Sequence, residues 1–301
     1  MQRDDIEFKA AGTTLRGWLY RPASAAAAGA PVVVMAHGYS AVKEMYLDAY
    51  AEVFAQAGLA VLAYDHRNFG ASAGEPRQEI DPVQQIRDWR DAITWVGQQP
   101  GIDAGRVGVW GSSYAGGHAL VLGAIDRRVK CVVAQLPLIS GHHNARRLTR
   151  ADLFAPTQAA FEADRLQRYN GGAPMTMPVV SNDPSAPCAL PTADAWAWFS
   201  DTARMRAPAW RNEVTLRSIE LYTEYEPGAY IGWISPTPLL MLVAAQDHVT
   251  VADLALDAFE QAREPKRLEL LRGGHFDAYT GAGFERSSAA AAEWFGRYLR
   301  V

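Results

Sequence analysis

The sequence predicts an α/β fold built on a mostly parallel central sheet flanked by helices. Short runs of β-branched and other apolar residues, such as Val32–Ala36, alternate with segments of helical periodicity. Such runs are typical of strands that are buried on both faces of a parallel sheet. The alternation extends to Leu136, stops, and resumes at Pro238. These observations predict one α/β core that is interrupted by an inserted segment.

The first part of the chain begins with an expected antiparallel hairpin, because Asp5–Ala10 and Thr14–Tyr20 alternate apolar and polar residues. The Ala-rich stretch 23–30 lies between two prolines and is expected to be a flexible connection. The strands expected next are 32–36, 59–64, 107–110 and 129–136, and the helices between them are 44–57, 81–98 and the segment after Ser113.

The segment after Leu136 has a different character, with dense aromatic residues and a Pro-rich stretch at 174–191. Helical segments are expected near 144–169 and 192–205. We expect residues 1–136 and 236–301 to form the core, and residues 137–235 to form a helical cap over the carboxyl ends of the strands. A second subdomain packed beside the core is the alternative. The core then continues with expected strands at 238–244 and 267–271 and helices at 251–263 and 285–299.

Composition narrows the class of protein. The chain of 301 residues is 49% hydrophobic and 21% charged, with a net charge of −4 and no Lys/Arg cluster, which argues against nucleic-acid and membrane partners. The polar N-terminus does not resemble a signal peptide, and no apolar run is long enough to span a bilayer. Cys131 and Cys188 lie far apart and are expected to be free thiols, so a cytoplasmic location is expected.

A serine in a turn of small residues is the strongest local signal. Gly111-Ser112-Ser113-Tyr114-Ala115 follows an apolar run and precedes a helical pattern, which is the context of a nucleophile elbow, G-x-S-x-G. Ser113 is the candidate nucleophile, and Ala115 stands where the last Gly is usual. An ordinary Gly/Ser loop that caps a helix is the alternative interpretation.

A serine nucleophile needs a base and an acid partner. Asp247 directly follows the expected strand 238–244, and His275 directly follows the expected strand 267–271. Asp277 also lies near His275, but it does not follow a strand, so Asp247 is preferred as the acid. For the oxyanion hole we expect the backbone N–H groups of Tyr114 and of Tyr39.

These motifs carry a resemblance to a known superfamily. His37-Gly-Tyr39, Asp65–Ser72, Gly111–Gly117, Ser235–Leu242 and Gly274–Tyr279 resemble the corresponding segments of α/β-hydrolases, in the group of dienelactone-hydrolase-like esterases and S15 proteins. The chain also resembles the fungal polyketide transferases and related bacterial hydrolases. The resemblance covers both flanks, and the order Ser113, Asp247, His275 agrees with it. It implies an α/β-hydrolase fold with the cap inserted between the later strands.

The other histidines are expected to be structural. His37 is expected to order its loop. Asp65, His66 and Arg67 are expected to brace the site. His118, on the helix after Ser113, is expected to be packed in the protein interior. His142 and His143 lack a third ligand at metal spacing, so no metal and no cofactor is expected. Any single aromatic residue of the cap is more often part of a core, but as a set bordering a cleft the cap aromatics are expected to contact the substrate. The candidates are Trp196, Trp198, Trp210, Tyr222 and Trp233.

The sequence thus predicts a carboxylesterase-like serine hydrolase that cleaves an ester, a thioester or an activated amide through an acyl-enzyme. Its partner is expected to be a small molecule with an apolar or aromatic group. An acyltransferase with the same three residues and an acceptor other than water is the alternative, and a non-catalytic binding protein is a third hypothesis. An exposed aromatic cap would be compatible with a homodimer.

Overall fold

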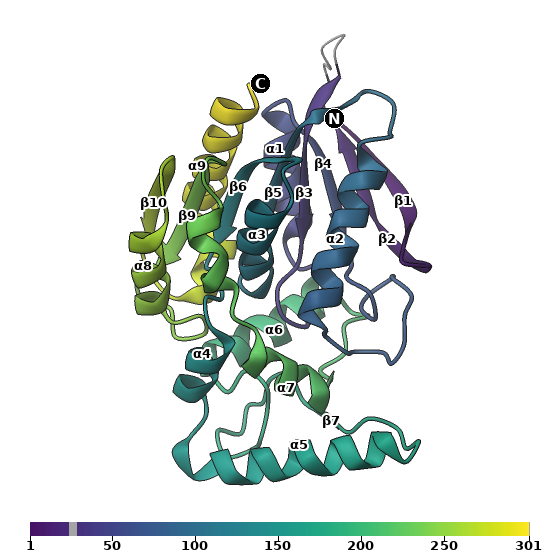
Figure 1. Ribbon diagram of the computed structural model, residues 1–301, viewed down its shortest axis with the longest axis vertical. Coiled ribbons are helices and arrows are strands. Elements are labelled where there is room, and N and C mark those ends of the chain that lie inside the picture. Colours follow the sequence, from purple (N-terminus) through teal and green to yellow (C-terminus); the bar gives the residue numbers. More distant parts are fainter. Residues whose placement is uncertain (24–28, 301) are drawn as a thin grey trace.

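The core of the protein is an eight-stranded sheet with the strand order β1-β2-β4-β3-β5-β6-β9-β10 (Figure 1). The computed structural model describes residues 1–23 and 29–300. The strands are β1 (Gln2–Ala10), β2 (Thr13–Arg21), β3 (Ala30–Ala36), β4 (Ala60–Tyr64), β5 (Ile102–Ser112), β6 (Val129–Gln135), β9 (Leu239–Ala244) and β10 (Lys266–Leu271).

The predicted N-terminal hairpin is confirmed, since β1 and β2 pair antiparallel and β2 also pairs antiparallel with β4. All further pairs in this sheet are parallel, whereas the short strands β7 (Thr176–Met177) and β8 (Val214–Thr215) pair antiparallel with each other outside it. The carboxyl ends of these parallel strands therefore meet at one edge of the sheet, which is where ligands bind in open α/β sheets. Much of the expected connection 23–30 lies outside the described residues.

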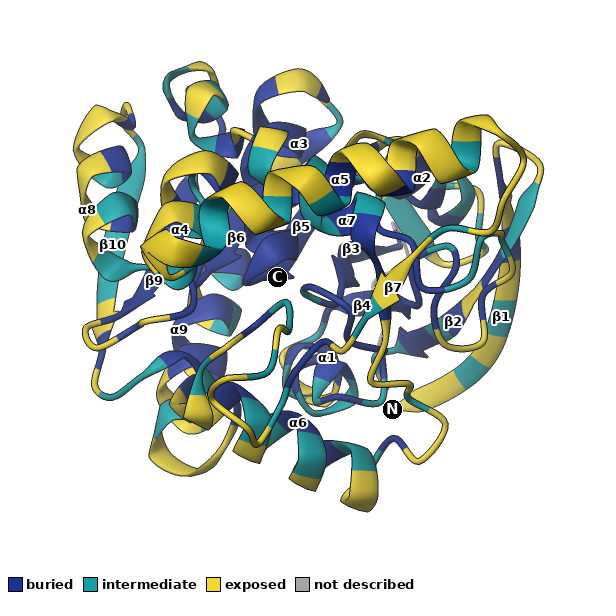
Figure 2. Cartoon of the chain, turned by 90° about the horizontal axis from the view of Figure 1, so that it is seen from below, coloured by how far each residue is buried: buried dark blue, intermediate teal, exposed yellow. Residues whose placement is uncertain are grey.

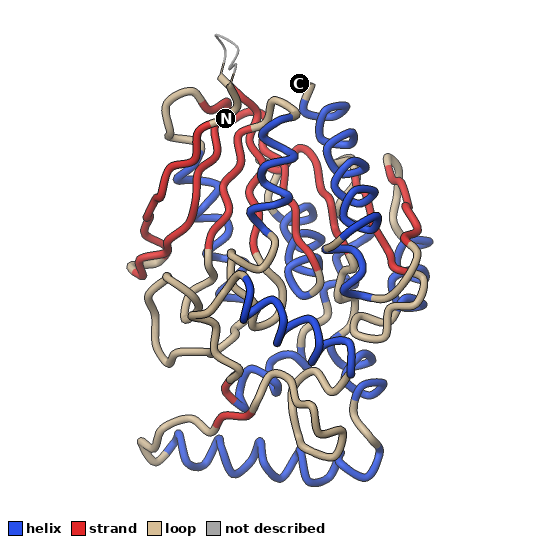
Figure 3. The backbone as a smooth tube through the Cα atoms, turned by 180° about the vertical axis from the view of Figure 1, so that it is seen from behind, coloured by secondary structure: helices blue, strands red, loops and turns tan. Residues whose placement is uncertain are grey.

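Helices cover both faces of the sheet (Figures 1 and 3). Alternate residues of β3 show the two layers: Val32 and Val34 belong to one buried cluster, and Val33 and Met35 belong to the other. This alternation follows from the two-residue period of a strand. On the first side lie α2 (Pro82–Val96), α3 (Tyr114–Ile125) and α8 (Ala252–Gln261), and on the second lie α1 (Leu47–Gln56) and α9 (Gly281–Leu299).

The helix boundaries follow local chemistry. Asp81 caps α2 by accepting a hydrogen bond from the Gln84 backbone N–H at 3.0 Å, and Pro82 occupies the first turn, as predicted. The helix α1 begins three residues later than its predicted start at Glu44, because Tyr46 has a left-handed backbone with φ 71°. None of the helices in the described part of the chain is long and apolar enough to cross a membrane.

The segment between β6 and β9 lies across the carboxyl-terminal edge of the sheet (Figures 1 and 2). The expected helix at 144–169 is two helices joined by a short 3-10 turn, and the segment also holds a helix over 216–224 that sequence patterns missed. Its elements are α4 (Gly141–Leu148), η1 (Ala151–Leu153), α5 (Phe154–Tyr169), β7 (Thr176–Met177), α6 (Ala193–Met205), β8 (Val214–Thr215), α7 (Leu216–Glu224) and η2 (Pro227–Trp233).

Candidate active site

Ser113 lies in the tight turn between β5 and α3, with φ 60° and ψ −122°. A serine rarely adopts a positive φ, and such strain is concentrated at functional sites. The turn requires small neighbours, because a Cβ at Gly111 would collide with the carbonyl group of Ala115. The methyl group of Ala115 itself is fully buried, so alanine fits where glycine is usual. The structure therefore forms the predicted strained elbow.

Asp247 and His275 meet beside this turn. Each follows the end of a strand, β9 and β10 respectively, and the Nδ1 atom of His275 lies 2.7 Å from Oδ2 of Asp247. Both side chains are almost completely buried. Asp277 instead accepts a hydrogen bond from the backbone N–H of Gly274, at 2.7 Å, and so caps the turn that carries His275. The structure thus brings together His275 and the carboxylate that the sequence favoured.

The Asp247 carboxylate is held ionised. Burial opposes its charge, but the adjacent His275 imidazole and two N–H donors outweigh burial and lower the pKa of Asp247 below its ordinary value. The donors are the backbone N–H groups of Val249 and Thr250, which lie 2.8 and 2.9 Å from Oδ1. An ionised carboxylate at Nδ1 keeps that nitrogen protonated and leaves Nε2 of His275 free to accept a proton.

Thr250 is a site residue that sequence reasoning missed. Its hydroxyl lies 3.0 Å from Oδ2 of Asp247 and 2.9 Å from the carbonyl oxygen of Leu136, at the end of β6. It therefore ties the loop that carries Asp247 to the neighbouring strand end. A threonine three residues after the candidate acid is the only sequence signal, and it is too common to be recognised alone.

Ser113 and His275 line the same cavity. The cavity also contains His37, Gly38 and Tyr39 from the loop after β3. Much of the remaining wall is apolar, and its larger members are Met45, Leu47, Leu190, Trp198, Phe199, Phe276 and Tyr279. A concave, mostly apolar space with a few convergent polar groups is the usual form of a small-molecule site.

The residues of the two expected oxyanion donors lie close to Ser113, Tyr114 as the next residue in the chain and Tyr39 in the wall of the same cavity. Tyr114 is the first residue of α3, so its backbone N–H has no acceptor within the helix. Tyr39 follows Gly38, where a Cβ would lie only 3.1 Å from the Cβ of Ser113. Glycine thus lets the β3 loop approach the nucleophile closely. The rings of Tyr39 and Tyr114 also pack edge to face, with centroids 5.4 Å apart.

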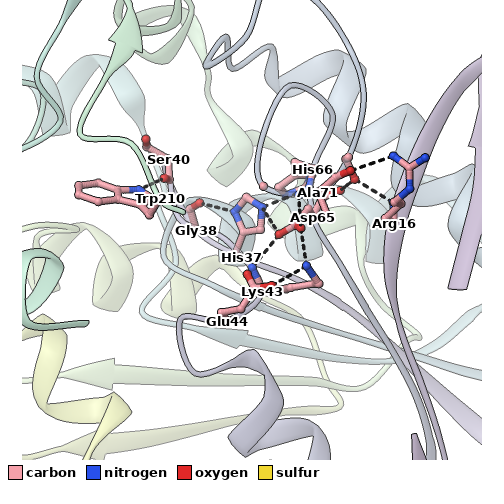
Figure 4. Close-up of polar contacts among 12 residues, drawn as sticks. Arg16, His37, Gly38, Ser40, Lys43, Glu44, Asp65, His66, Ala71 and Trp210 are labelled. Carbon is pink, nitrogen blue, oxygen red and sulfur yellow. Dashed lines mark hydrogen bonds and ion pairs between the residues drawn. The ribbon is translucent and has the colours of Figure 1, made fainter. Parts of the chain in front are cut away.

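A buried polar network supports the β3 loop (Figure 4). His37 accepts a hydrogen bond from the backbone N–H of His66 at its Nε2 atom (3.1 Å), so its Nδ1 donates to the carbonyl oxygen of Gly38 (3.0 Å). Burial lowers the pKa of His37, which keeps the ring neutral in this tautomer. His37 therefore orders its loop, as expected from the sequence.

Asp65 is the fully buried centre of this network. Its carboxylate accepts hydrogen bonds from the backbone N–H and the ammonium group of Lys43, both at 2.8 Å, and from the backbone N–H of Ala71 at 2.9 Å. A buried carboxylate is tolerable only with such partners. The loop after β4 thus braces the loop after β3, on which Tyr39 lies.

A second network, which unlike the first was not expected from the sequence, holds the turn that carries His275. The hydroxyl groups of Ser112 and Tyr279 lie 2.6 Å apart, and the Gln135 side chain donates to the Tyr50 hydroxyl at 3.0 Å. Tyr50 in turn donates to the carbonyl oxygen of Ala278 at 2.6 Å. The Ser112 hydroxyl, next to the candidate nucleophile, therefore has a structural role as a hydrogen-bond partner of Tyr279.

The structure brings only some of the five expected aromatic contacts to the site. Trp198 lines the cavity of Ser113, and Trp210 stands behind it, stacked on Phe199 with ring centroids 5.2 Å apart. The indole N–H of Trp210 donates to the carbonyl oxygen of Ser40 at 2.7 Å. Tyr222 lines a second cavity that shares Tyr39 with the first.

Trp196 and Trp233 are not among the residues that line the Ser113 cavity. Trp196 lines a separate pocket together with residues of the loop 181–193. Trp233 is 62% exposed and packs edge to face against Tyr230. The aromatic density of the segment therefore did not identify which rings face the site. Within the described residues, no group of three or more His, Cys, Asp or Glu side chains could hold a metal ion.

A strained serine at a strand-to-helix turn, and a histidine–carboxylate pair at two later strand ends, define an enzyme of the α/β-hydrolase fold. A model of the X-Pro dipeptidyl-peptidase (S15) family matches residues 11–277. The chain belongs to this family, which confirms the resemblance drawn from the sequence, and it is a hydrolase.

Relatives of known name cover nearly the whole chain. Thiohydrolase aneE of Aspergillus aculeatus is 34% identical over 292 residues, or 93% of this chain and 89% of aneE. The quorum-quenching protein AidA of Acinetobacter baumannii is 32% identical, over 94% of this chain and 90% of AidA. The crystal structure of the α/β-hydrolase GrgF of Penicillium sp. matches with a TM-score of 0.87 and 30% identity over 100% of both chains. In sequence, polyketide transferase grgF is 33% identical over 92% of this chain and 90% of its own length.

Proposed function

We propose that the protein hydrolyses small-molecule thioesters or esters through an acyl-enzyme on Ser113, with His275 as the base and Asp247 as its acid partner. The observation that carries this proposal is the strained Ser113 backbone in one cavity with His275, whose Nδ1 is bound to Asp247 at 2.7 Å. A nucleophile, a base and an acid partner that orients the base together activate a serine hydroxyl.

The proposed reaction has two halves. Ser113 Oγ attacks the substrate carbonyl carbon while Nε2 of His275 takes the hydroxyl proton, and the backbone N–H groups of Tyr39 and Tyr114 stabilise the oxyanion. The carbon–sulfur or carbon–oxygen bond breaks, and the leaving group takes the proton back from His275. Water then attacks the acyl-enzyme by the same route, which releases the acid and restores Ser113.

The wall of the cavity and the names of the relatives support the choice of substrate. Rings such as Trp198, Phe199 and Phe276 favour an apolar or aromatic group over a charged one. Among the relatives, aneE is named a thiohydrolase. We propose that residues 137–235 act as the cap of this site, because Leu190, Trp198 and Phe199 from this segment complete the wall around Ser113.

A fluorophosphonate probe tests the nucleophile. We expect the probe to label the native protein and the Ser112→Ala variant, and Ser113→Ala to abolish labelling, because only Ser113 is activated by His275. Ser112 is the matched control, since it is the adjacent serine on the same turn. Undiminished labelling of Ser113→Ala, read by intact-protein mass, would show that another residue is the nucleophile.

Acyl transfer to an alcohol or amine is the second candidate function. Two observations favour it: Ser113 is only 9% exposed and His275 only 2%, and the relative grgF is named a polyketide transferase. A site that excludes water lets another acceptor compete for the acyl-enzyme. Product analysis of a thioester incubated with added alcohols separates the two functions: free acid supports hydrolysis, and a new ester as the main product supports transfer.

A further inference from the structure

A second, larger cavity adjoins the cavity of Ser113. We call this second cavity the cap chamber. It lies among α4, α5, α7 and the loop 184–191, and includes Ala145, Thr157 and Ile219 in its wall. These elements lie together beyond the carboxyl edge of the sheet (Figure 1). The proposed reaction gives this chamber no role.

The two cavities share a wall. Tyr39 and Leu190 line both of them, so the chamber begins where the candidate oxyanion loop ends. Leu190 is 7% exposed and Tyr39 is 6% exposed, which places the shared wall inside the protein. A ligand that reaches past these two side chains would therefore extend from the cavity of Ser113 into the chamber.

The lining of the chamber indicates the chemistry of its occupant. Among the lining residues only Arg150 carries a full charge, and its guanidinium is already paired with Asp152 at 2.8 Å. Leucine, isoleucine, methionine, alanine and proline side chains supply much of the remaining wall. Because burying an unpaired charge in such a wall is costly, the chamber suits a neutral, mostly apolar chain.

The geometry of acyl transfer decides which part of the substrate occupies the chamber. The carbonyl oxygen must face the N–H groups of Tyr39 and Tyr114, and the leaving atom must face His275, which returns its proton. His275 and its neighbour Phe276 line only the cavity of Ser113. The leaving group is thus assigned to that cavity, and the third substituent of the carbonyl carbon is left to pass Tyr39.

We propose that the cap chamber binds the acyl chain of the substrate, and that it makes the enzyme selective for long, apolar acyl groups. This proposal rests on the proposed acyl-enzyme function of Ser113. Each methylene buried in the chamber contributes roughly fourfold to binding. Selectivity should therefore grow with acyl length and be independent of the leaving group.

Filling the chamber tests this proposal. Thr157→Trp, on α5, and Ala145→Phe, on α4, each place an aromatic ring in the chamber wall from a different helix. Gln158→Trp is the matched control, because Gln158 is the exposed neighbour of Thr157 on the same helix. The readout is the ratio of kcat/KM for p-nitrophenyl octanoate to that for p-nitrophenyl acetate. A ratio is unaffected by partial loss of folded enzyme.

We expect both chamber variants to lower this ratio at least about tenfold, since excluding a few methylenes forfeits their binding. Gln158→Trp should keep the native ratio. A second series, acetate esters of p-nitrophenol, 4-methylumbelliferone and 2-naphthol, should show no change of preference in any variant. An unchanged octanoate-to-acetate ratio in both chamber variants, or a change confined to the leaving-group series, would overturn the proposal. Absence of all ester and thioester turnover in the native protein would instead refute the proposed function.

Cys188 offers a test without a bulky substitution. It lines the chamber and is partly exposed, whereas the other cysteine, Cys131, is fully buried. Butyl methanethiosulfonate should attach a chain at Cys188, as intact mass will show, and lower octanoate turnover while sparing acetate turnover. Cys188→Ser should show no change on treatment. Equal octanoate turnover before and after complete modification would contradict the assignment of the chamber.

Discussion

At the scale of single residues, the site depends on a strained backbone that its neighbours hold in place. A non-glycine residue in such a region costs about 1–3 kcal/mol. Ser113 remains there because its N–H donates to the carbonyl oxygen of Gln135 at 2.8 Å, and its own carbonyl accepts from Gly116 and Leu138 at 2.9 and 3.0 Å. These bonds tie the turn to β6 and keep the side chain directed into the cavity.

Asp247→Asn tests the role of the carboxylate. The amide can donate a hydrogen bond to Nδ1 of His275, which would place the imidazole proton on Nε2 and prevent that nitrogen from acting as a base. We expect kcat for an activated ester to fall by about 10³- to 10⁴-fold, with little change in KM. Steady-state kinetics measures both. A fall in kcat of less than tenfold would contradict this expectation and would show that Asp247 does not set the tautomer of His275.

The matched control for this experiment is Asp277→Asn. Asp277 lies two residues from His275 but bonds the backbone of Gly274 and not the imidazole. We therefore expect kcat to change far less than in Asp247→Asn. The difference between the two variants isolates the carboxylate that acts on His275.

At the scale of elements, a buried side chain of the segment between β6 and β9 bonds to the loop that carries Asp247. Asn144, on α4, donates from Nδ2 to the Tyr222 hydroxyl and to the Val249 carbonyl oxygen, both at 2.7 Å. Its Oδ1 accepts from the Val251 backbone N–H at 3.0 Å. Three hydrogen bonds thus join α4, α7 and the loop after β9.

Asn144→Ala should disturb both stability and catalysis. Loss of three buried hydrogen bonds should lower the free energy of unfolding by about 2–4 kcal/mol. Because Val249 and Val251 flank the backbone that orients Asp247, kcat/KM should also fall by at least about tenfold. Urea denaturation and ester kinetics measure these effects. His143 is the exposed neighbour of Asn144 on α4. We expect His143→Ala to change neither the free energy of unfolding nor kcat/KM. Equal effects in both variants would show that any substitution on this helix has the effect and that the Asn144 hydrogen bonds do not cause it.

The same segment is where prediction from sequence was weakest. The single helix expected over 144–169 is broken because Thr149 and Arg150 are extended, with ψ of 130° and 141°. Pro156 lies in the first turn of α5, where its missing N–H costs nothing, but it would have interrupted a continuous helix. The helix over 216–224 was missed, although Thr215 caps it by accepting from the Ser218 N–H at 3.3 Å.

At the scale of the whole molecule, three buried histidines pack against one another, and one of them, His37, lines the cavity of Ser113. His37, His66 and His118 come from three different segments, with ring centroids of neighbours 4.7 and 5.8 Å apart. Burial lowers the pKa of each, that of His118 to about 3. His118 nevertheless has polar contacts: its ring nitrogens lie 2.8 Å from the Tyr225 hydroxyl and 3.0 Å from the Gln85 amide oxygen.

These lowered pKa values predict acid sensitivity of the fold. Below about pH 6.5 an unfolded histidine binds a proton that the folded one does not, so the unfolded state is favoured as the pH falls. Each such histidine should lower the free energy of unfolding by about 1.4 kcal/mol per pH unit as the pH falls, until the pKa of that histidine in the folded protein is reached. Denaturant unfolding between pH 7 and 4 should show this loss, and His118→Gln should reduce the slope by up to one proton. An identical slope in the variant would show that His118 is not neutral in the folded protein.

The sequence by itself determined the α/β core, the strained turn at Ser113 and the pairing of Asp247 with His275. These features follow from local signals, namely buried runs, small residues in a turn and polar residues directly after strands, and parallel strands bring their carboxyl ends together in any such sheet. The roles of Thr250 and Asn144 depend on the tertiary structure alone, whereas the bracing role of the Asp65 loop was expected from its place after a strand. Partners of Thr250 and Asn144 lie on distant segments, and nothing local distinguishes these two side chains from ordinary polar residues. Likewise, Trp198 lines the cavity whereas Trp233 is exposed to solvent. The density of aromatic residues in the sequence does not distinguish the two, because the packing of helices against one another determines which face of each element is buried.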